Sequence, residues 1–332
     1  MTPTETTPIA RPARLGALQI GSAAEGTAAT LDRLLAHRAA LIEARLDLLV
    51  LPEALLGGYP KGADFGTRLG YRTPDGREAY LAYWRQAVAL DGPEVGALRD
   101  LARAANSAIV AGVVERDGAT LYCTALFIDA GGALIGRHRK LMPTATERLV
   151  WGQGSAIEPT VMETRAGRAA AAICWENYMP QYRQALYRQG IDIWCAPTVD
   201  ERDIWRASMR HIAYEARCFL ISACQFQPPA TSALGRPITL RDRAEDAAMI
   251  GGGSMIVSPL GEVLAGPLIG AEGLIVADID RDDVIRARFD LDVVGHYARA
   301  ELFEAKIPAQ AMSSTAETAA ASGTSPPNSN GA

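Results

Sequence analysis

The sequence predicts one large α/β domain in which mixed β-sheets are layered with helices. Short apolar runs alternate with amphipathic helical patterns in the first and middle thirds of the 332-residue chain. Between residues 108 and 139, and again between 252 and 280, apolar runs instead follow one another across tight turns, as in antiparallel hairpins. The runs do not alternate strictly with polar residues, which indicates sheets that are covered on their faces.

The first third of the chain alternates strands with helices. Residues 27–44 carry apolar side chains at helical spacing, and residues 46–51 form a continuous apolar run that ends at Pro52-Glu53. The glycine-rich stretch 57–75 is predicted to be a loop. Up to residue 139 we therefore expect strands at 15–20, 46–51, 108–115, 120–129 and 134–139, and helices at 27–44, 78–89 and 93–106.

In the second half of the chain, a run of small apolar residues at 169–174 is predicted to be the central strand. It ends at Cys174, and Pro180 is typical of the first turn of a helix that continues to about residue 189. The stretch 141–157 is loop-like, and the polar stretch 231–247 is expected on the surface. The remaining elements expected are strands at 191–195, 219–223, 252–258, 262–265 and 274–280, and helices at 203–217 and 282–288.

Both ends of the chain differ in composition from the rest. Residues 1–13 are rich in Thr and Pro, and residues 307–332 consist largely of Ala, Ser, Thr, Pro and Gly. Such segments cannot bury an apolar core, so we expect a disordered extension at 1–13, one domain at 14–306 and a disordered tail at 307–332.

Charge and cysteine usage exclude several classes of function. The formal net charge is −5 with both signs interspersed, which argues against nucleic acid or a membrane surface as partner. The five cysteines are odd in number and irregularly spaced, and the four histidines are far apart, so we expect no zinc site. With no signal-peptide pattern and no apolar run of membrane-spanning length, we expect a cytoplasmic protein.

Cys174 is the first candidate for chemistry. A cysteine at the end of a buried strand and facing the start of a helix lies where free N–H groups favour thiolate over thiol. The alternative is a small core residue, because free cysteines are often buried.

Three expected strand ends carry reactive groups, namely Glu53, Lys140 and Cys174. A partly dry carboxylate can deprotonate a thiol, and a lysine ammonium can stabilise the negative charge that develops on the substrate. The three residues together suit acyl transfer through a thioester. The alternatives are a loop-capping carboxylate for Glu53 and a solvated side chain for Lys140.

Three motif blocks resemble the nitrilase branch of the carbon–nitrogen hydrolase superfamily, and the similarity extends from about residue 14 to 303. The blocks are LPEA at 51–54 with GYPKG at 58–62, HRKLMPT at 138–144 with Glu147-Arg148, and CWENYMP at 174–180. The block TVDERD at 198–203 is most similar to bacterial arylacetonitrilases.

The resemblance implies a four-layer αββα sandwich and a Glu–Lys–Cys triad. In that family pattern Glu53 is the general base, Lys140 the stabilising cation and Cys174 the nucleophile, while Glu147 positions the site. The Trp175 backbone N–H would join Lys140 in stabilising the developing charge. The implied reaction converts a small, arylaliphatic nitrile and water to the carboxylic acid and ammonia through a thioimidate and a thioester. The implied assembly is a homo-oligomer built from dimers, which in many nitrilases extends to spirals or filaments.

Aromatic residues near the blocks are candidates for the substrate pocket. We expect Tyr59, Trp175 and Tyr178 to bind substrate, with core packing or an interface as the alternative. For the whole protein, the alternatives are an amidase or carbamoyl hydrolase of the same superfamily and a non-catalytic scaffold. Two segments, Ser155-Ala156 and Ala300-Glu301, depart from the family pattern.

Overall fold

The computed structural model describes residues 12–155, 160–229 and 248–299. The tail expected at 307–332, the surface stretch expected at 231–247, and the family departures at Ala156 and Ala300-Glu301 lie outside the described residues. So do residues 1–11 of the expected N-terminal extension, whereas Ala13 is the first residue of a strand.

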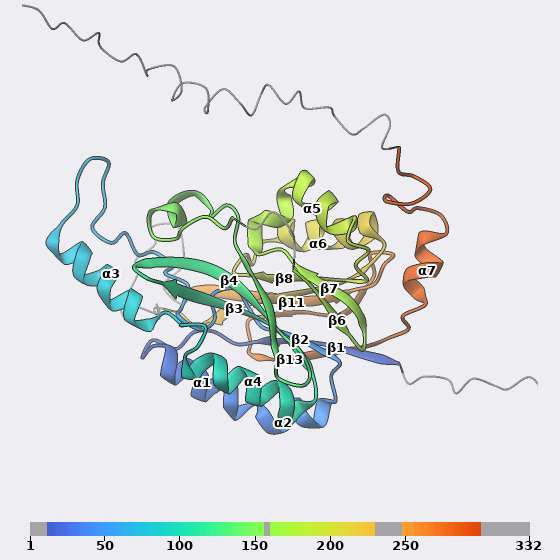
Figure 1. Ribbon diagram of the computed structural model, residues 1–332, viewed down its shortest axis with the longest axis horizontal. Coiled ribbons are helices and arrows are strands. Elements are labelled where there is room, and N and C mark those ends of the chain that lie inside the picture. The colour runs from blue at the N-terminus through green and yellow to red at the C-terminus, as the bar shows by residue number, and fades with distance from the viewer. Residues whose placement is uncertain (1–11, 156–159, 230–247, 300–332) are drawn as a thin grey trace, which may run out of the picture.

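Two mixed β-sheets lie face to face at the centre of the molecule (Figure 1). The first has the strand order β13-β1-β2-β3-β4-β5. Strands β1, β2 and β3 run parallel to one another, and the outer pairs are antiparallel. The strands are β1 (Ala13–Gln19), β2 (Leu48–Val50), β3 (Ala108–Asp117), β4 (Thr120–Ile128), β5 (Leu134–Arg139) and β13 (Gly273–Ile279).

The second sheet has the order β10-β11-β9-β8-β7-β6, and β12 pairs with β11. Its parallel strands are β7, β8 and β9. The strands are β6 (Val161–Thr164), β7 (Gly167–Ala171), β8 (Ile193–Thr198), β9 (Phe219–Cys224), β10 (Phe226–Gln227), β11 (Ile250–Val257) and β12 (Val263–Ile269).

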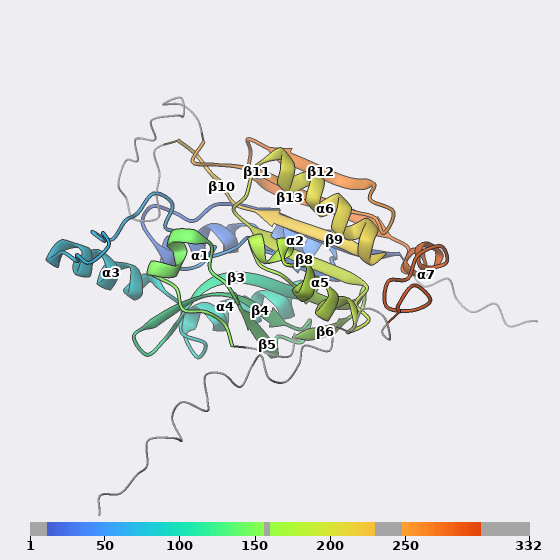
Figure 2. The ribbon, with the colours of Figure 1, turned by 90° about the horizontal axis from the view of Figure 1, so that it is seen from above.

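Helices cover the outer faces of both sheets, which gives the expected four-layer αββα sandwich (Figures 1 and 2). Helices α1, α2 and α4 lie outside the first sheet, and α5 and α6 lie outside the second. Helices α3 and α7 lie at opposite ends of the molecule. Their bounds are α1 (Thr27–Ala36), α2 (Arg38–Ala44), α3 (Pro74–Gln86), α4 (Pro93–Ala105), α5 (Pro180–Tyr187), α6 (Asp203–Ala216) and α7 (Asp283–Arg288).

Pleating of the strands divides the apolar side chains among three cores. In and after β7, Ala169, Ala171 and Ile173 face the core between the sheets, while Ala170 and Ala172 join the core under α5 and α6. A third core packs the first sheet against its helices. Because apolar side chains leave both faces of the strands, the sequence shows continuous apolar runs in place of alternation.

Most expected elements are present, with differences at their ends. The helix expected at 27–44 is two helices, because the chain tightens at His37, whose N–H donates to the carbonyl of Leu34 (3.1 Å). The strand expected to reach Cys174 ends at Ala171. Strands β6 and β10 were not expected, since four and two residues carry too short a pattern to detect.

Gly112 in β3 lies against the loop that carries Glu53. A Cβ atom at this position would be 2.1 Å from the carbonyl oxygen of Pro52 and 2.6 Å from the Cα of Glu53. We therefore expect Gly112→Ala to displace the Glu53 backbone and to lower the free energy of unfolding by about 1–3 kcal/mol, as overpacking does. Chemical denaturation measures the change.

Gly96→Ala in α4 is the matched control. A Cβ there meets no atom within 4 Å outside its own helix. The same added methyl group should raise the free energy of unfolding by about 0.5–1 kcal/mol, because glycine is unfavourable inside a helix. A Gly112→Ala protein as stable as the wild type would contradict this account of how Glu53 is held.

Candidate active site

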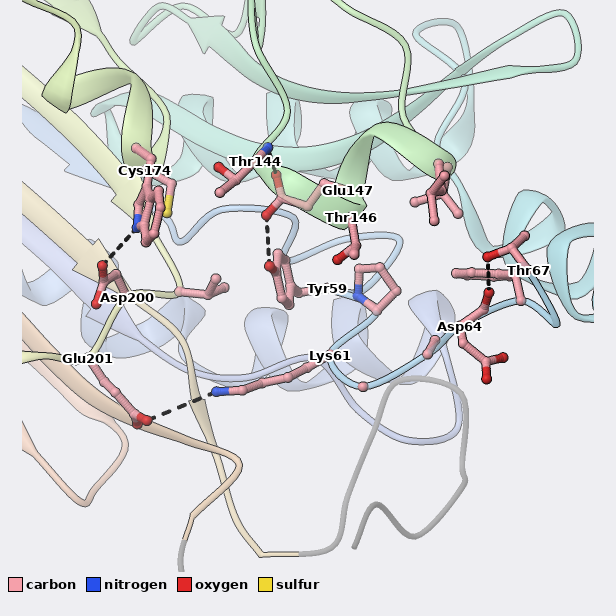
Figure 3. Close-up of a pocket in the computed structure, with 18 of the residues that line it drawn as sticks. Tyr59, Lys61, Asp64, Thr67, Thr144, Thr146, Glu147, Cys174, Asp200 and Glu201 are labelled. Atoms are coloured by element: carbon pink, nitrogen blue, oxygen red, sulfur yellow. Dashed lines mark hydrogen bonds and ion pairs between the residues drawn. The ribbon is translucent and has the colours of Figure 1, made fainter. Parts of the chain in front are cut away.

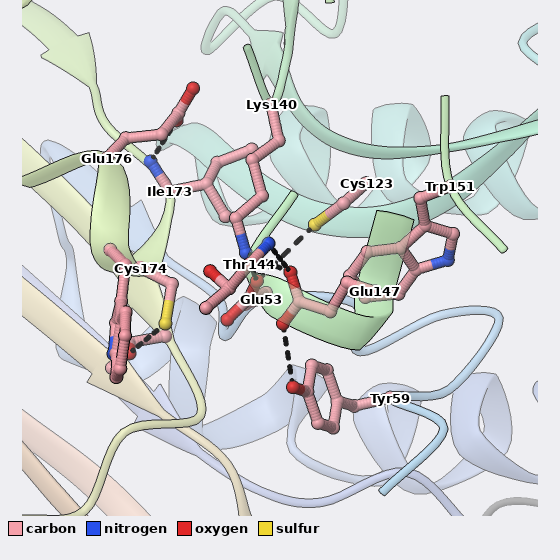
Figure 4. A network of polar contacts seen from close by, with 12 residues as sticks. Glu53, Tyr59, Cys123, Lys140, Thr144, Glu147, Trp151, Ile173, Cys174 and Glu176 are labelled. Atoms are coloured by element: carbon pink, nitrogen blue, oxygen red, sulfur yellow. Dashed lines mark hydrogen bonds and ion pairs between the residues drawn. The ribbon is translucent and has the colours of Figure 1, made fainter. Parts of the chain in front are cut away.

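Four segments from both sheets bring acidic, basic and thiol groups together (Figure 4). Glu53 lies in the loop after β2, and Lys140 directly follows β5. Glu147 belongs to the short 3₁₀ helix η1 (Ala145–Leu149), and Cys174 is the first residue of η2 (Cys174–Tyr178). The structure thus brings together the four residues that the sequence placed in the site.

The ammonium of Lys140 lies between two carboxylates. Its Nζ atom is 2.7 Å from Glu53 Oε1 and 2.8 Å from Glu147 Oε2. The side chains of Lys140 and Glu53 are both 0% exposed. A buried ion pair of this kind is retained only where each charge keeps close partners.

The two carboxylates differ in how many donors they meet. Glu147 also accepts hydrogen bonds from the hydroxyl of Tyr59 (2.7 Å) and the backbone N–H of Thr144 (2.6 Å). Within the described residues, Glu53 Oε2 is buried with no hydrogen-bond partner. Glu147 is therefore held in place, whereas Glu53 keeps one oxygen able to accept a proton.

Cys174 lies in a turn and not at the end of a strand. Its backbone has φ 49°, a conformation that residues other than glycine adopt only when neighbours hold them. The side-chain amide of Asn177 donates to the carbonyls of Ala172 (2.8 Å) and Cys174 (2.7 Å). The indole N–H of Trp194 in turn donates to Asn177 (2.7 Å), which fixes the amide in place.

Burial of Cys174 corrects the expectation that the start of a helix favours its thiolate. Burial, followed by the nearby Glu53 carboxylate, raises the pKa of the Cys174 thiol well above its usual value. The Lys140 ammonium and a hydrogen bond with Thr198 (Oγ1 to Sγ 3.2 Å) act in the opposite direction and lower that pKa. Burial and the Glu53 carboxylate thus favour the neutral thiol over the thiolate.

Burial and charge also oppose each other at Glu53 and Lys140. Burial raises the pKa of its carboxyl above the ordinary value, and the charge of Lys140 is the main influence that lowers it. For Lys140, burial works to lower the pKa, but the carboxylate of Glu53 and the other acidic neighbours raise it well above normal. Lys140 consequently stays charged while Glu53 can exchange a proton.

Cys123 also contacts the site, although no sequence pattern distinguishes it from the other core cysteines. Its thiol lies on the inner face of β4 and donates to Glu53 Oε1 at 3.6 Å. Burial raises the pKa of this thiol well above its usual value, so it acts as a neutral donor. The pairing of β4 with β3, which itself lies against the Glu53 loop, places Cys123 beside Glu53. A sequence pattern does not contain that information.

A cavity of about 540 Å³ opens onto Cys174 (Figure 3). Tyr59, Glu147 and Trp175 line it, as do Leu149 and Val150. Two of the three expected substrate-binding residues, Tyr59 and Trp175, therefore face this space. The other lining residues are Pro60, Lys61, Gly62, Ala63, Asp64, Phe65, Thr67, Thr144, Thr146, Val199, Asp200, Glu201 and Arg202.

Trp175 is fixed as one wall of the cavity, and Tyr178 lies behind it. The Trp175 indole N–H donates to Asp200 (2.9 Å), and the guanidinium of Arg202 lies 5.0 Å from the ring centroid. Tyr178 is not among the described residues that line the cavity, contrary to our expectation. Its ring packs edge-on against Trp175 and against the buried Trp205, each at 5.9 Å.

The described residues contain no group of three or more His, Cys, Asp or Glu side chains placed to hold a metal ion. None of their helices is long and apolar enough to cross a membrane.

Comparison with known proteins gives one family. The model of the carbon–nitrogen hydrolase family matches residues 14–289. An aliphatic nitrilase from Sinorhizobium fredii is 49% identical over 260 residues, covering 78% of this chain and 83% of that protein. An arylacetonitrilase from Trametes versicolor is 45% identical over 306 residues, covering 87% and 95%. The crystal structure of a carbon–nitrogen hydrolase from Helicobacter pylori is similar with a TM-score of 0.70 over 88% of this chain and 97% of that chain; at 16% identity it shows the fold alone.

Lys140→Met tests the buried ammonium. Removing the cation should lower the free energy of unfolding by about 3–5 kcal/mol, because two buried carboxylates lose their counter-charge. The charge of Lys140 lowers the pKa of Glu53, so removing Lys140 raises the pKa of folded Glu53 further above that of the unfolded chain. A carboxyl whose pKa is higher in the folded state destabilises the fold once it ionises, so the loss of unfolding free energy should be larger at pH 8 than at pH 5. Urea denaturation at both pH values measures it.

Arg286→Met is the matched control on the surface. Arg286 also lies between two carboxylates, Asp280 at 2.7 Å and Asp283 at 2.5 Å, but it is 60% exposed. Because solvent screens this cluster, we expect little change at either pH. Wild-type stability of Lys140→Met at pH 8 would show that the buried ammonium does not hold the carboxylates.

Proposed function

Because the chain belongs to the carbon–nitrogen hydrolase family, we propose that it is a nitrilase, which hydrolyses a small organic nitrile to the carboxylic acid and ammonia. The observation that carries this proposal is the placement of the Cys174 thiol on the cavity, beside the buried pair of Glu53 and Lys140. No metal or organic cofactor enters the proposed reaction, since the nitrile carbon is already electrophilic.

The first half of the reaction adds the thiol to the nitrile. Glu53 takes the proton of Cys174, and the sulfur forms a bond to the nitrile carbon. One π bond of the C≡N group breaks, and its electron pair moves to nitrogen, which receives the proton back from Glu53 and gives a thioimidate. Lys140 and the backbone N–H of Trp175, which lies too early in η2 for an intrahelical partner, stabilise the charge on nitrogen.

The second half consumes two waters. Glu53 activates the first water, which adds to the thioimidate carbon and gives a tetrahedral adduct. Glu53 then moves the hydroxyl proton of this adduct to its nitrogen, so that ammonia leaves as the C=O bond forms and a thioester remains. A second water then adds, the bond to sulfur breaks, and the carboxylic acid leaves with Cys174 restored as a thiol. If the tetrahedral adduct expels the sulfur in place of ammonia, the product is the amide.

Glu147 is proposed to position Lys140. It binds the ammonium together with Glu53, and Tyr59 and Thr144 fix its own carboxylate. Burial raises the pKa of Tyr59, so this residue remains a neutral donor across the working pH range. The arrangement leaves the ammonium little freedom to leave the reacting nitrogen.

We propose an arylaliphatic nitrile as the substrate class. An aromatic ring on a short linker fits a cavity whose walls near Cys174 include Tyr59, Trp175, Leu149 and Val150. The relatives include proteins named for arylacetonitriles and for aliphatic nitriles, so both classes belong in the test.

Two further proposals concern the setting of the enzyme. We propose a cytoplasmic protein, since all five cysteines are free and buried, as a reducing compartment allows.

We also propose a homo-oligomer built from dimers that extends to spirals or filaments. Ile204 and Tyr214 expose large apolar surface on α6 and support this. Sedimentation velocity should give a dimer or larger species, and a monomer at micromolar concentration would overturn the assembly.

Cys174→Ala tests the proposed function. The wild type should release ammonia from phenylacetonitrile or mandelonitrile, and the variant should release none above background while keeping its thermal unfolding temperature. Cys218→Ala, which removes a buried thiol of the outer core, is the matched control and should retain the wild-type rate.

A parallel panel with an aliphatic dinitrile and the matching amides separates the alternatives. Ammonia from the amides but not from the nitriles would favour an amidase or carbamoyl hydrolase. No turnover across the panel, together with no alkylation of Cys174, would favour a non-catalytic scaffold.

A further inference from the structure

Glu176 is a buried carboxylate that the proposed reaction does not use. It lies two residues after Cys174 and is 1% exposed. Its Oε2 atom accepts the backbone N–H of Ile173 (2.7 Å), and its Oε1 atom accepts that of Leu141 (2.6 Å). Figure 4 shows the first of these bonds beside the Cys174 turn. One carboxylate therefore binds the residue before the thiol and the residue after Lys140.

A second path of contacts runs parallel to the first. His138, two residues before Lys140 on β5, has its Nε2 atom 2.9 Å and 3.1 Å from the two oxygens of Glu176. Its ring stacks on Tyr182 with centroids 5.4 Å apart. The Tyr182 hydroxyl donates to the carbonyl of Ala171 at the end of β7 (3.1 Å). This buried group also connects the end of β5 with the end of β7.

These contacts matter because β5 and β7 belong to different sheets. Lys140 is carried by the first sheet and Cys174 by the second. The core between the sheets is largely apolar, and apolar contact is non-directional, so it does not by itself fix how the strand ends are aligned. The hydrogen bonds that Glu176 accepts from both segments are directional and fix this alignment beside Cys174. Gln19 and Gln225 make directional bonds elsewhere between the sheets.

We infer that Glu176 is a positioning residue that fixes the Cys174 turn relative to Lys140 and thereby sets how the covalent adduct divides between acid and amide. The inference rests on the proposed function. The adduct is bonded to Cys174 while its nitrogen must meet Lys140 and Glu53. A displacement of about 1 Å between such groups can cost about a hundredfold in rate.

A shift of the Cys174 turn relative to Lys140 affects the two ways in which the tetrahedral adduct breaks down unequally. Formation of acid requires Glu53 to deliver a proton to nitrogen before ammonia leaves. Formation of amide breaks the bond to sulfur: the electron pair stays on Cys174, the C=O bond forms, and the hydroxyl proton of the adduct moves to the departing sulfur and restores the thiol. A looser link between the sheets slows the proton delivery more than the departure of sulfur, so the share of amide rises.

Glu176→Gln is the principal test. The glutamine has the same shape, but its NH₂ group must face one of the two backbone N–H donors, so one bond of the link is lost. We expect kcat to fall about tenfold or more with KM changed less than about threefold, since binding in the cavity is untouched. The amide-to-acid ratio should rise severalfold. This ratio does not depend on how much of the enzyme is active, so partial unfolding cannot produce the change.

Glu115→Gln is the matched control. Glu115 is also a carboxylate that is 1% exposed, and it accepts hydrogen bonds from Thr124 (2.8 Å) and Arg139 (2.5 Å) within the first sheet. Its loss should lower the unfolding temperature and leave the product ratio unchanged. If Glu176→Gln fails to fold, Tyr182→Phe removes only a hydroxyl from the second path and should raise the amide share in the same direction by a smaller factor. A wild-type product ratio in Glu176→Gln, or in Tyr182→Phe where Glu176→Gln does not fold, would overturn the inference.

Alkylation of Cys174 by iodoacetamide separates this inference from the proposed function. It needs no nitrile and depends on the placement of Glu53 and Lys140 around the thiol. We expect slower alkylation in Glu176→Gln and the wild-type rate in Glu115→Gln. If the wild type hydrolyses no nitrile but the alkylation difference persists, the function fails and the positioning role remains. If nitriles are hydrolysed and Glu176→Gln matches the wild type in both assays, the positioning role fails.

Discussion

The site depends on one buried cation between two carboxylates. Glu53, Lys140 and Glu147 come from three separate segments, and the ammonium lies within 2.8 Å of both acids. None of these charges would be stable alone in an apolar interior, because each would lose its hydration without compensation. The ammonium therefore has a structural and a chemical consequence: it allows an acidic group to remain buried, and it limits how far burial raises the pKa of Glu53.

Burial and nearby charges also act in opposite directions on the pKa of the Cys174 thiol. Burial and the Glu53 carboxylate raise the pKa of Cys174, while Lys140 and Thr198 lower it. The strained turn at Cys174 directs the sulfur toward the cavity, and Asn177 and Trp194 hold that turn. Since the thiol and the ammonium belong to different sheets, the proposed chemistry also requires the sheets to stay aligned, and the contacts of Glu176 cross between them.

The fold was largely predictable from the sequence, because a continuous apolar run indicates a strand that is buried on both faces. The resemblance to the nitrilase branch of the family is confirmed, as is the four-layer sandwich. The strand end at Ala171 was missed because Ala172 and Ile173 are as apolar as the strand before them. The proximity of Cys123 to Glu53 and the position of Tyr178 behind Trp175 were also missed. Both depend on contacts between distant segments, which local spacing does not encode.

The proposed reaction requires Glu53 to be a buried carboxyl whose pKa is raised, so that it can accept the proton of Cys174. Infrared difference spectroscopy tests this most directly. The spectrum of the wild type minus that of Glu53→Gln isolates the protonated-carboxyl band of Glu53, which is followed as a function of pH. The account predicts a titration midpoint above the ordinary glutamate value of about 4.3. A midpoint at or below that value would contradict it.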